Sequence, residues 1–210
     1  VRTPFPGTTD FSSFLQQGQR SRANVIGLAN AGGDTINSIK QAAEFRITRG
    51  GTKIAGLLVF VTDVHSLGLE VAQGLVLTET FYWDLNDRTR AFTRRLGAMP
   101  GNLRPSMVQA GCYSGILHYL KAVGDMGVAA AKASGVEAVN RMKAMPTSDD
   151  AFGEGTVRPD GRKIHPAYLF EVKTPAESRG AWDYYKLIST IPANEAFRPI
   201  TEGACALVRS

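Results

Sequence analysis

The sequence has few cysteines, which stabilise many small proteins through disulfides, and no apolar segment long enough to cross a membrane. Two cysteines among 210 residues exclude a scaffold built on disulfides. The longest apolar run, residues 54–61, falls far short of the roughly 18 residues that a transmembrane helix requires. Glycine, in contrast, is abundant at 22 residues, which indicates many tight loops. The composition therefore predicts a globular protein that is long enough to bury its own core.

The motifs of the common catalytic and metal sites are also missing. The histidines His65, His118 and His165 form no HxxxH pair, and the cysteines form no CxxC pair, so no metal site is expected. Neither a Walker A sequence nor a complete GxGxxG occurs, and there is no GxSxG elbow. Gly32-Gly33 could introduce an anion-binding helix, but a plain turn is the favoured interpretation. The residues alone show no recognisable combination of catalytic groups, and no cofactor is predicted.

The surplus of basic residues does not by itself indicate nucleic-acid binding. Lys and Arg number 24, and Asp and Glu number 19, which gives a net charge of +5. The basic residues are scattered, and the densest group is Arg88, Arg90, Arg94 and Arg95. At helical spacing this group forms a solvated face, and no RNA-binding or zinc-finger signature accompanies it. No nucleic-acid partner is predicted.

Apolar runs and helical patterns alternate in the first third of the chain. Residues 24–29 and 53–61 are apolar runs typical of buried parallel strands, and residues 34–45 have helical periodicity. This order predicts a right-handed βαβ unit followed by a loop at 62–65. The other predicted elements are a helix at 10–22, a short helix at 66–72, a strand at 74–80, helices at 86–96, 106–123 and 135–145, a hairpin within 156–172, and an irregular segment at 176–210. The predicted fold class is α/β, with a parallel-rich layer from residues 1–78 and 165–175 flanked by helices.

Residues 106–123 give the clearest helical pattern. The apolar positions of this helix are predicted to be buried, and they are Val108, Cys112, Ile116, Leu120 and Val123. Cys112 is accordingly a predicted core residue rather than a nucleophile. The helix at 135–145 is predicted to turn Val136, Val139 and Met142 inward. Both cysteines, Cys112 and Cys205, are expected to be unpaired.

Polar residues follow the two predicted parallel strands. Asn30 comes directly after the first strand, and Thr62 and Asp63 come directly after the second. Open parallel sheets bind ligands outside the carboxyl ends of their strands, so these three residues are candidate binding residues. Asn30 can donate and accept, which suits a carboxylate or an amide, whereas Asp63 favours an amine or another donor. The alternative is that they are capping and turn residues, since Asp and Thr often satisfy local backbone groups.

Several phrases of the sequence, in their order and spacing, resemble one family. The phrases are residues 6–15 (PGTTDFSSFL), 24–33 (NVIGLANAGG), 74–77 (GLVL), 108–122, 155–162 (GTVRPDGR) and 168–173 (YLFEVK). Together they are similar to the periplasmic substrate-binding proteins of ABC importers, in the branched-chain amino-acid type. The resemblance implies a type I periplasmic-binding-protein-like fold, of which this chain is the C-terminal portion. Residues 1–78 would be the second-lobe βαβ core, 79–160 the crossover and helices that return to the first lobe, and 161–210 the closing strand of the second lobe with the C-terminal tail.

The same resemblance implies a binding function without chemistry. Such proteins capture a small molecule by closing two lobes and deliver it to a permease in the inner membrane, so the expected location is the periplasm. Carried over by position, the binding loops contain Asn30-Ala31 and Thr62-Asp63, and Tyr82 lies where an aromatic ring could close over the ligand. Amino-acid binders often have an aromatic residue near the place of Ala31 and a Glu near that of Asp63. An amide, a carboxylate or an aromatic acid is therefore as open as a branched-chain amino acid.

Two other functions and one state of assembly stay open. The chain could be a nucleotide-dependent α/β enzyme, or a ligand-sensing regulatory domain on the same fold. Residues 81–155 have amphipathic helices but no strands for them to cover. Their apolar faces therefore stay exposed or pack on a second copy of the chain, so a homodimer of the fragment is one expected state.

Overall fold

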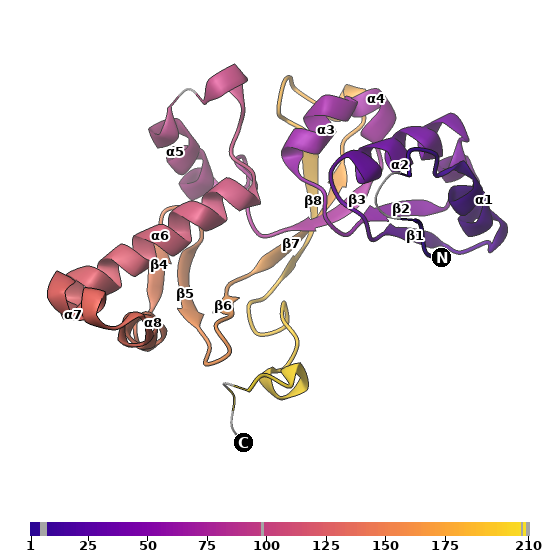
Figure 1. Cartoon of the computed structure of the whole chain (residues 1–210). Helices are drawn as coiled ribbons and strands as arrows, with labels where there is room; N and C mark the ends of the chain where they lie inside the picture. Colours follow the sequence, from indigo (N-terminus) through magenta and orange to yellow (C-terminus); the bar gives the residue numbers. More distant parts are fainter. Residues whose placement is uncertain (5–7, 98, 207, 209–210) are drawn as a thin grey trace. The chain divides into compact units, whose positions relative to one another are not determined.

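Figure 1 shows the computed structural model, which describes residues 1–4, 8–97, 99–206 and 208. Pro6-Gly7, where the first phrase of the resemblance begins, lie outside the described residues. The chain divides into two compact units. Unit 1 comprises residues 1–79 and 168–189, and unit 2 comprises residues 80–167 and 190–210. No helix within the described residues is long and apolar enough to cross a membrane.

Unit 1 is built on a five-stranded sheet with the order β1-β2-β3-β7-β8. Its strands are β1 (Val25–Leu28), β2 (Lys53–Gly56), β3 (Val76–Glu79), β7 (Ala167–Val172) and β8 (Tyr185–Ile191). The first three are parallel, and β7 runs antiparallel to β3 with Tyr168 opposite Glu79. The predicted parallel-rich α/β layer is therefore confirmed. The carboxyl ends of β1, β2 and β3 consequently lie at one edge of the sheet.

Four helices belong to unit 1, and apolar burial explains their packing. They are α1 (Ser12–Arg20), α2 (Gly33–Glu44), α3 (Val61–Leu67) and α4 (Leu69–Ala72). Helix α2 packs against the other three, and its Ile39 and Ala42 are buried. A short 3₁₀ turn, η1 (Ile47–Gly50), leads from α2 into β2 and buries Ile47. Another, η3 (Pro175–Glu177), follows β7.

The strand predicted at 53–61 is too long, and the loop predicted at 62–65 is wrong. Strand β2 ends at Gly56, where a Cβ atom would lie only 2.3 Å from Cγ2 of Val59. The chain turns there, and α3 begins at Val61 because the Asp63 carboxylate accepts a hydrogen bond from the Phe60 N–H at 2.9 Å. Thr62 and Asp63 thus lie in the first turn of a helix. The apolar residues after Gly56 resemble a strand only because buried strands and buried helix faces have the same composition.

Unit 2 combines four helices with a small antiparallel sheet. The helices are α5 (Asp87–Leu96), α6 (Met107–Met126), α7 (Val128–Ala133) and α8 (Gly135–Ala144), and the strands are β4 (Thr147–Asp149), β5 (Gly153–Val157) and β6 (Lys163–Ile164). Side chains of Asn86, Ser106 and Ser134 cap α5, α6 and α8, which fixes where these helices begin. Two 3₁₀ turns, η2 (Pro100–Asn102) and η4 (Ile200–Gly203), complete the unit. Its core is formed by Phe81, Phe92, Ala110, Ala151 and Phe152.

Two predictions for the second half of the chain need correction. The turn at Pro159-Asp160-Gly161 is present, but β5 pairs there with β6, and the predicted second arm is β7 in the other sheet. The segment at 176–210, predicted to be irregular, contains β8. Strand β8, which lies beside β7 in the sheet, was missed because its residues after Tyr185 are mostly exposed and show no buried alternation.

The predicted buried stripe of α6 is wrong. Val108, Ile116 and Leu120 are 48%, 61% and 56% exposed, and Cys112 is exposed as well. The residues that α6 buries are instead Ala110, Ser114, His118 and Ala122. Ser114 Oγ donates to Asp149 Oδ2 at 2.5 Å, and His118 Nε2 lies 2.8 Å from the Met142 carbonyl oxygen. These two hydrogen bonds hold the polar face of α6 inward, although His118 Nδ1 has no hydrogen-bond partner among the described residues. The larger apolar side chains remain outside.

Helix α8 shows the same inversion. Its buried residue is Ala138, whereas Val136 and Val139, predicted to face inward, are exposed. Helices α6 and α8 pack against each other through their small residues, which permits close approach of the two backbones. We name the exposed residues Val108, Ile116, Leu120, Val136 and Val139 the apolar face of unit 2.

Candidate functional site

A groove of about 670 Å³ opens at the carboxyl ends of β1 and β2. Its lining combines polar and apolar side chains from the segments that follow these strands, together with the first residues of the chain: Val1, Arg2, Thr3, Ala29, Asn30, Ala31, Asp34, Leu57 and Leu58. We name it the strand-end groove. Open α/β sheets bind ligands outside the carboxyl ends of their strands, so this place was expected from the strand order. The groove is large enough for a small organic molecule.

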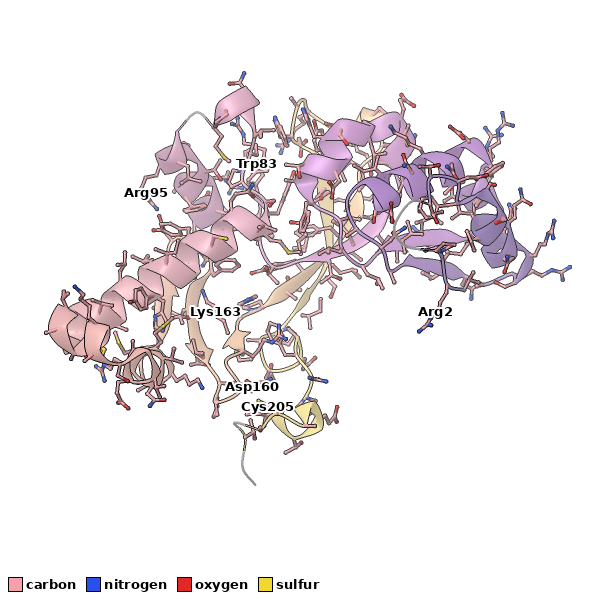
Figure 2. The ribbon with its side chains drawn as sticks, viewed as in Figure 1. Arg2, Trp83, Arg95, Asp160, Lys163 and Cys205 are labelled. Carbon is pink, nitrogen blue, oxygen red and sulfur yellow. The ribbon has the colours of Figure 1, made fainter. Side chains whose placement is uncertain are left out.

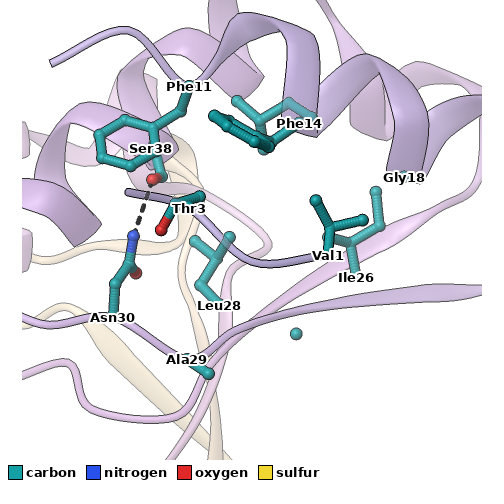
Figure 3. A pocket seen from close by; sticks show the side chains of 12 residues that line it. Val1, Thr3, Phe11, Phe14, Gly18, Ile26, Leu28, Ala29, Asn30 and Ser38 are labelled. Carbon is teal, nitrogen blue, oxygen red and sulfur yellow. Dashed lines mark hydrogen bonds between the residues drawn. The ribbon is translucent and has the colours of Figure 1, made fainter. Parts of the chain in front are cut away.

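Asn30 is held in place at the edge of this groove. Its Nδ2 donates to Ser38 Oγ at 3.0 Å (Figure 3). Its Oδ1 accepts from Thr35 Oγ1 at 2.8 Å. Both partners lie on α2 and are buried. A primary amide has two N–H donors and an oxygen with two lone pairs, so one donor and one acceptor position remain for a ligand. The Asn30 side chain is therefore held in a fixed position and can still form two hydrogen bonds with a ligand.

The start of α2 adds charge and polarity beside Asn30. Gly32 has φ +58°, a conformation that glycine adopts without strain, and as the N-cap residue it offers no side chain to the first N–H groups of the helix. Those groups and the helix dipole favour a negatively charged ligand atom, whereas the half-buried Asp34 carboxylate favours a donor. Leu57 and Leu58 supply an exposed apolar wall. The groove can thus hold a small molecule that carries both polar groups and apolar surface.

An apolar pocket of about 240 Å³ borders the groove between α1, β1 and α2. Figure 3 shows Phe11, Phe14, Ile26 and Leu28 around it, with Asn30 at its rim. Ala29 and Asn30 line both cavities. An apolar part of a ligand that reaches past Asn30 would therefore find aromatic and aliphatic contacts.

The predicted binding residues do not all line one cavity. Asn30 and Ala31 line the strand-end groove, whereas Thr62 and Asp63 lie in the first turn of α3 and are not among its lining residues. Asp63 is engaged as a cap, as the alternative interpretation anticipated, and burial raises the pKa of its carboxyl although the Phe60 N–H opposes the shift. Tyr82 belongs to unit 2, where its side chain is 3% exposed.

Sequence reasoning missed Leu57, Leu58 and Asp34. The two leucines follow β2 directly once its true end at Gly56 is known, so a correct strand boundary would have found them. Glycine within the apolar run was the available signal, since glycine in a strand pattern often marks a bend. Asp34 lies in the first turn of α2 and lines the groove as well.

Glu79 ends β3 at the same edge of the sheet and is completely buried. Tyr185 Oη donates to Glu79 Oε1 at 2.9 Å, and Oε2 has no hydrogen-bond partner among the described residues. Burial raises the pKa of Glu79 to about 8; the Tyr185 hydrogen bond opposes this shift, and the nearby Asp63 carboxylate adds to it. The carboxyl is therefore neutral at pH 7. Within the part of the chain that the structure describes, no group of three or more His, Cys, Asp or Glu residues is arranged to hold a metal ion.

Comparisons with known proteins show which family this chain resembles. Residues 1–181 match the family described as periplasmic binding protein. A periplasmic binding protein from Burkholderia mallei is 46% identical, with a TM-score of 0.87 over 100% of this chain and 54% of that chain. A branched chain amino acid ABC transporter periplasmic ligand-binding protein from Burkholderia xenovorans LB400 is 40% identical, with a TM-score of 0.83 over 99% of this chain and 54% of that chain.

A more distant relative shares the fold. An ABC transporter solute-binding protein from R. palustris, in complex with 4-hydroxybenzoate, is 22% identical, with a TM-score of 0.74 over 92% of this chain and 51% of that chain. None of the curated protein sequences matches this chain. The chain spans about half the length of the solved structures described above. The family match covers most of the chain, and the Burkholderia mallei protein is similar over all of it, so the chain belongs to the periplasmic binding protein family.

Proposed function

We propose that this chain is part of the solute-binding component of an ABC importer. In this proposal the protein captures a small molecule between two lobes in the periplasm and delivers it to a permease in the inner membrane, without catalysing a reaction. The observation that carries the proposal is the strand-end groove, which lies where parallel α/β sheets bind ligands in a chain of this family. Neither a nucleotide-dependent enzyme nor a regulatory domain has a comparable observation in its favour.

Unit 1 is the proposed second lobe of the binding protein. In this proposal residues 1–78 are the βαβ core of that lobe, and residues 79–160 are the crossover and the helices that return to the first lobe. Residues 161–210 supply the closing strand of the second lobe, β7, and the C-terminal tail. Asn30 and Ala31 are the proposed ligand contacts of this lobe, together with Leu57 and Leu58. Thr62 and Asp63 act on the site through α3, which continues the segment that carries the two leucines. Tyr82, which is buried and belongs to unit 2, stays a prediction from the sequence.

The proposed ligand is an amino acid, an amide or a small organic acid that has an apolar part. One relative is named for branched-chain amino acid transport, and another binds 4-hydroxybenzoate. The groove suits both kinds of molecule, since free N–H groups at the start of α2 attract a carboxylate and Leu57 and Leu58 contact an apolar side chain or ring. Asp34 distinguishes them, because its carboxylate favours a ligand with an ammonium group.

Isothermal titration calorimetry on a chimeric protein tests this proposal. In this chimera, which we name the reconstituted protein, the 210-residue chain is joined to the part of the Burkholderia mallei relative that the chain does not cover. Leucine and 4-hydroxybenzoate are titrated separately. Asn30→Ala removes a direct contact, so it is expected to weaken binding about tenfold, the equivalent of one hydrogen bond. Asp63→Ala loosens the start of α3, so it is expected to weaken binding through the segment that carries Leu57 and Leu58.

Asn24→Ala is the matched control. Asn24 precedes β1, so it lies at the opposite end of the strand from Asn30, and its side chain is exposed. This variant should bind as the parent does. Unchanged affinity in both Asn30→Ala and Asp63→Ala, for a ligand that the parent binds, would remove the assignment of the site.

The apolar face of unit 2 supports a second proposal, which concerns assembly. The 210-residue chain by itself is proposed to form a homodimer through Val108, Ile116, Leu120, Val136 and Val139, because exposed apolar side chains of two neighbouring helices favour association. Light scattering after size exclusion should give the mass of a dimer, and Leu120→Glu should give a monomer. Val25→Glu, which changes an exposed apolar residue of unit 1, is the control that should remain dimeric. A monomeric parent chain would contradict this proposal.

A further inference from the structure

Unit 2 contains a pocket of about 310 Å³ in which three arginines meet a tryptophan. It lies between α5 and the segment around η2, and its lining residues are Trp83, Arg90, Thr93, Arg94, Gly97, Asn102 and Arg104. Trp83 is labelled in Figure 2. We name this cavity the arginine pocket. Its residues are separate from the strand-end groove of unit 1.

The three arginines differ in how their charge is compensated. Arg90 contacts Asp84 Oδ1 at 2.9 Å and Asp87 Oδ1 at 2.7 Å, so two carboxylates already neutralise it. Among the described residues, no carboxylate forms an ion pair with Arg94 or Arg104. The local charge is therefore positive at these two side chains.

Arg104 has an unsatisfied donor. Its Cζ lies 5.2 Å from the centroid of the Trp83 ring, so the guanidinium is held over the indole. Its Nε is buried and has no hydrogen-bond partner among the described residues. A buried N–H without an acceptor is costly, and most native structures supply a partner from the protein, from water or from a ligand. Arg104 lines the pocket, so an acceptor that enters it meets donors of this guanidinium.

We propose that the arginine pocket binds a small oxyanion, which Arg94 and Arg104 hold. The guanidinium group presents its N–H donors in a planar fork that matches the oxygens of carboxylate, sulfate and phosphate groups. The volume of the pocket suits an inorganic anion or a small organic acid rather than a nucleotide or a peptide. Trp83 fixes the Arg104 fork in advance, which lowers the entropy lost when the anion binds.

The test uses the 210-residue chain labelled with ¹⁵N. The Nε–Hε resonances of arginine side chains are followed by NMR while sodium phosphate or, in a separate arm, sodium benzoate is added at constant ionic strength. The expected result is a saturating shift of the Arg104 resonance with one anion bound per chain. Saturation by phosphate alone assigns the site to tetrahedral oxyanions, and saturation by benzoate alone assigns it to carboxylates. A linear shift without saturation in both arms overturns the proposal.

Variants separate a built site from general attraction to a basic protein. Arg104→Gln and Arg94→Gln should each weaken binding by about tenfold, the loss of one charge-assisted hydrogen bond. Arg49→Gln is the matched control, because it removes the same charge from an exposed position in unit 1 and should leave the affinity unchanged. Equal weakening by Arg49→Gln and Arg94→Gln would overturn the proposal. Arg94 is exposed, so Arg94→Gln is expected to fold even if Arg104→Gln does not. In that case the affinity of Arg94→Gln for the anion, compared with that of Arg49→Gln, tests the proposal.

Discussion

The buried carboxyl of Glu79 leads to a prediction about the pH dependence of stability. The side chain is completely buried at the end of β3, and burial raises its pKa from 4.5 to about 8. In the unfolded chain the same carboxyl has its ordinary pKa of 4.5, so it loses its proton once the pH exceeds this value. Between these two values the folded state holds a proton that the unfolded state has released. The free energy of unfolding must therefore fall as the pH rises from about 4.5 to about 8.

The magnitude follows from the size of the pKa change. A shift from 4.5 to about 8 corresponds to a loss on the order of 5 kcal/mol across this range. Glu79→Gln removes the ionisable group but keeps its shape, and the Gln Oε1 can still accept the hydrogen bond that Tyr185 Oη donates at 2.9 Å. The variant should therefore match the parent near pH 5 and exceed it in stability by several kcal/mol above pH 8.

Urea unfolding followed by far-ultraviolet circular dichroism, in steps from pH 5 to pH 9, measures this difference. Glu70→Gln is the matched control, since Glu70 lies exposed on α4 of the same unit and its variant should track the parent at every pH. The reasoning fails if the stability curves of Glu79→Gln and the parent stay parallel over the whole range. A variant that is less stable than the parent at pH 9 would show that the folded protein needs the ionised carboxylate.

Three further predictions concern packing, exposure and a polar network. Gly56→Ala should destabilise the protein by about 1–3 kcal/mol in thermal unfolding, because the new Cβ atom would clash with Val59. The control Gly27→Ala should destabilise the protein less, because its new Cβ atom would meet no atom within 4 Å. Equal effects of the two variants would contradict the close approach of Gly56 and Val59. Cys112 should react with a thiol reagent in the folded protein as fast as in a short peptide, because it is exposed, and protection of this thiol would show that α6 buries the opposite face. Asp149→Asn should lower stability by about 1–3 kcal/mol at pH 7, since Asp149 accepts hydrogen bonds from Ser114 and the Phe152 N–H and contacts Lys163 Nζ at 3.1 Å. These bonds lower the pKa of Asp149 although burial opposes them, so the deficit of the variant should vanish as the pH falls through that pKa, and a deficit independent of pH would refute the charged role.

The parallel βαβ unit could be predicted because its signals are local. The apolar run at 24–29 and the helical pattern at 34–45 each point to one kind of element, and their order leaves few topologies. Asn30 could be placed at the carboxyl end of β1 for the same reason. The end of β2 could not be placed, because an apolar run has the same composition whether its residues continue a strand or begin a buried helix.

The buried face of α6 could not be predicted from periodicity. The helix has two stripes at the same spacing, one of larger apolar residues such as Ile116 and one of alanine and polar residues such as Ser114 and His118. Which stripe faces inward depends on the partners, here Asp149 and the Met142 carbonyl, and these come from later parts of the chain. The expectation that residues 81–155 contain no strands was wrong, because β4 and most of β5 lie there and contact α6 and α8. The larger apolar residues of both helices are nevertheless exposed, because β4 and β5 meet the other sides of the helices.

The structure of a ligand complex tests the proposed site most directly. The reconstituted protein would be crystallised with a solute that calorimetry shows it to bind, and the contacts of that solute would be measured. The account predicts a hydrogen bond between the ligand and the free donor or acceptor of Asn30, with apolar ligand atoms against Leu57 or Leu58. A bound solute that contacts none of these residues would contradict the assignment of the strand-end groove as the binding site.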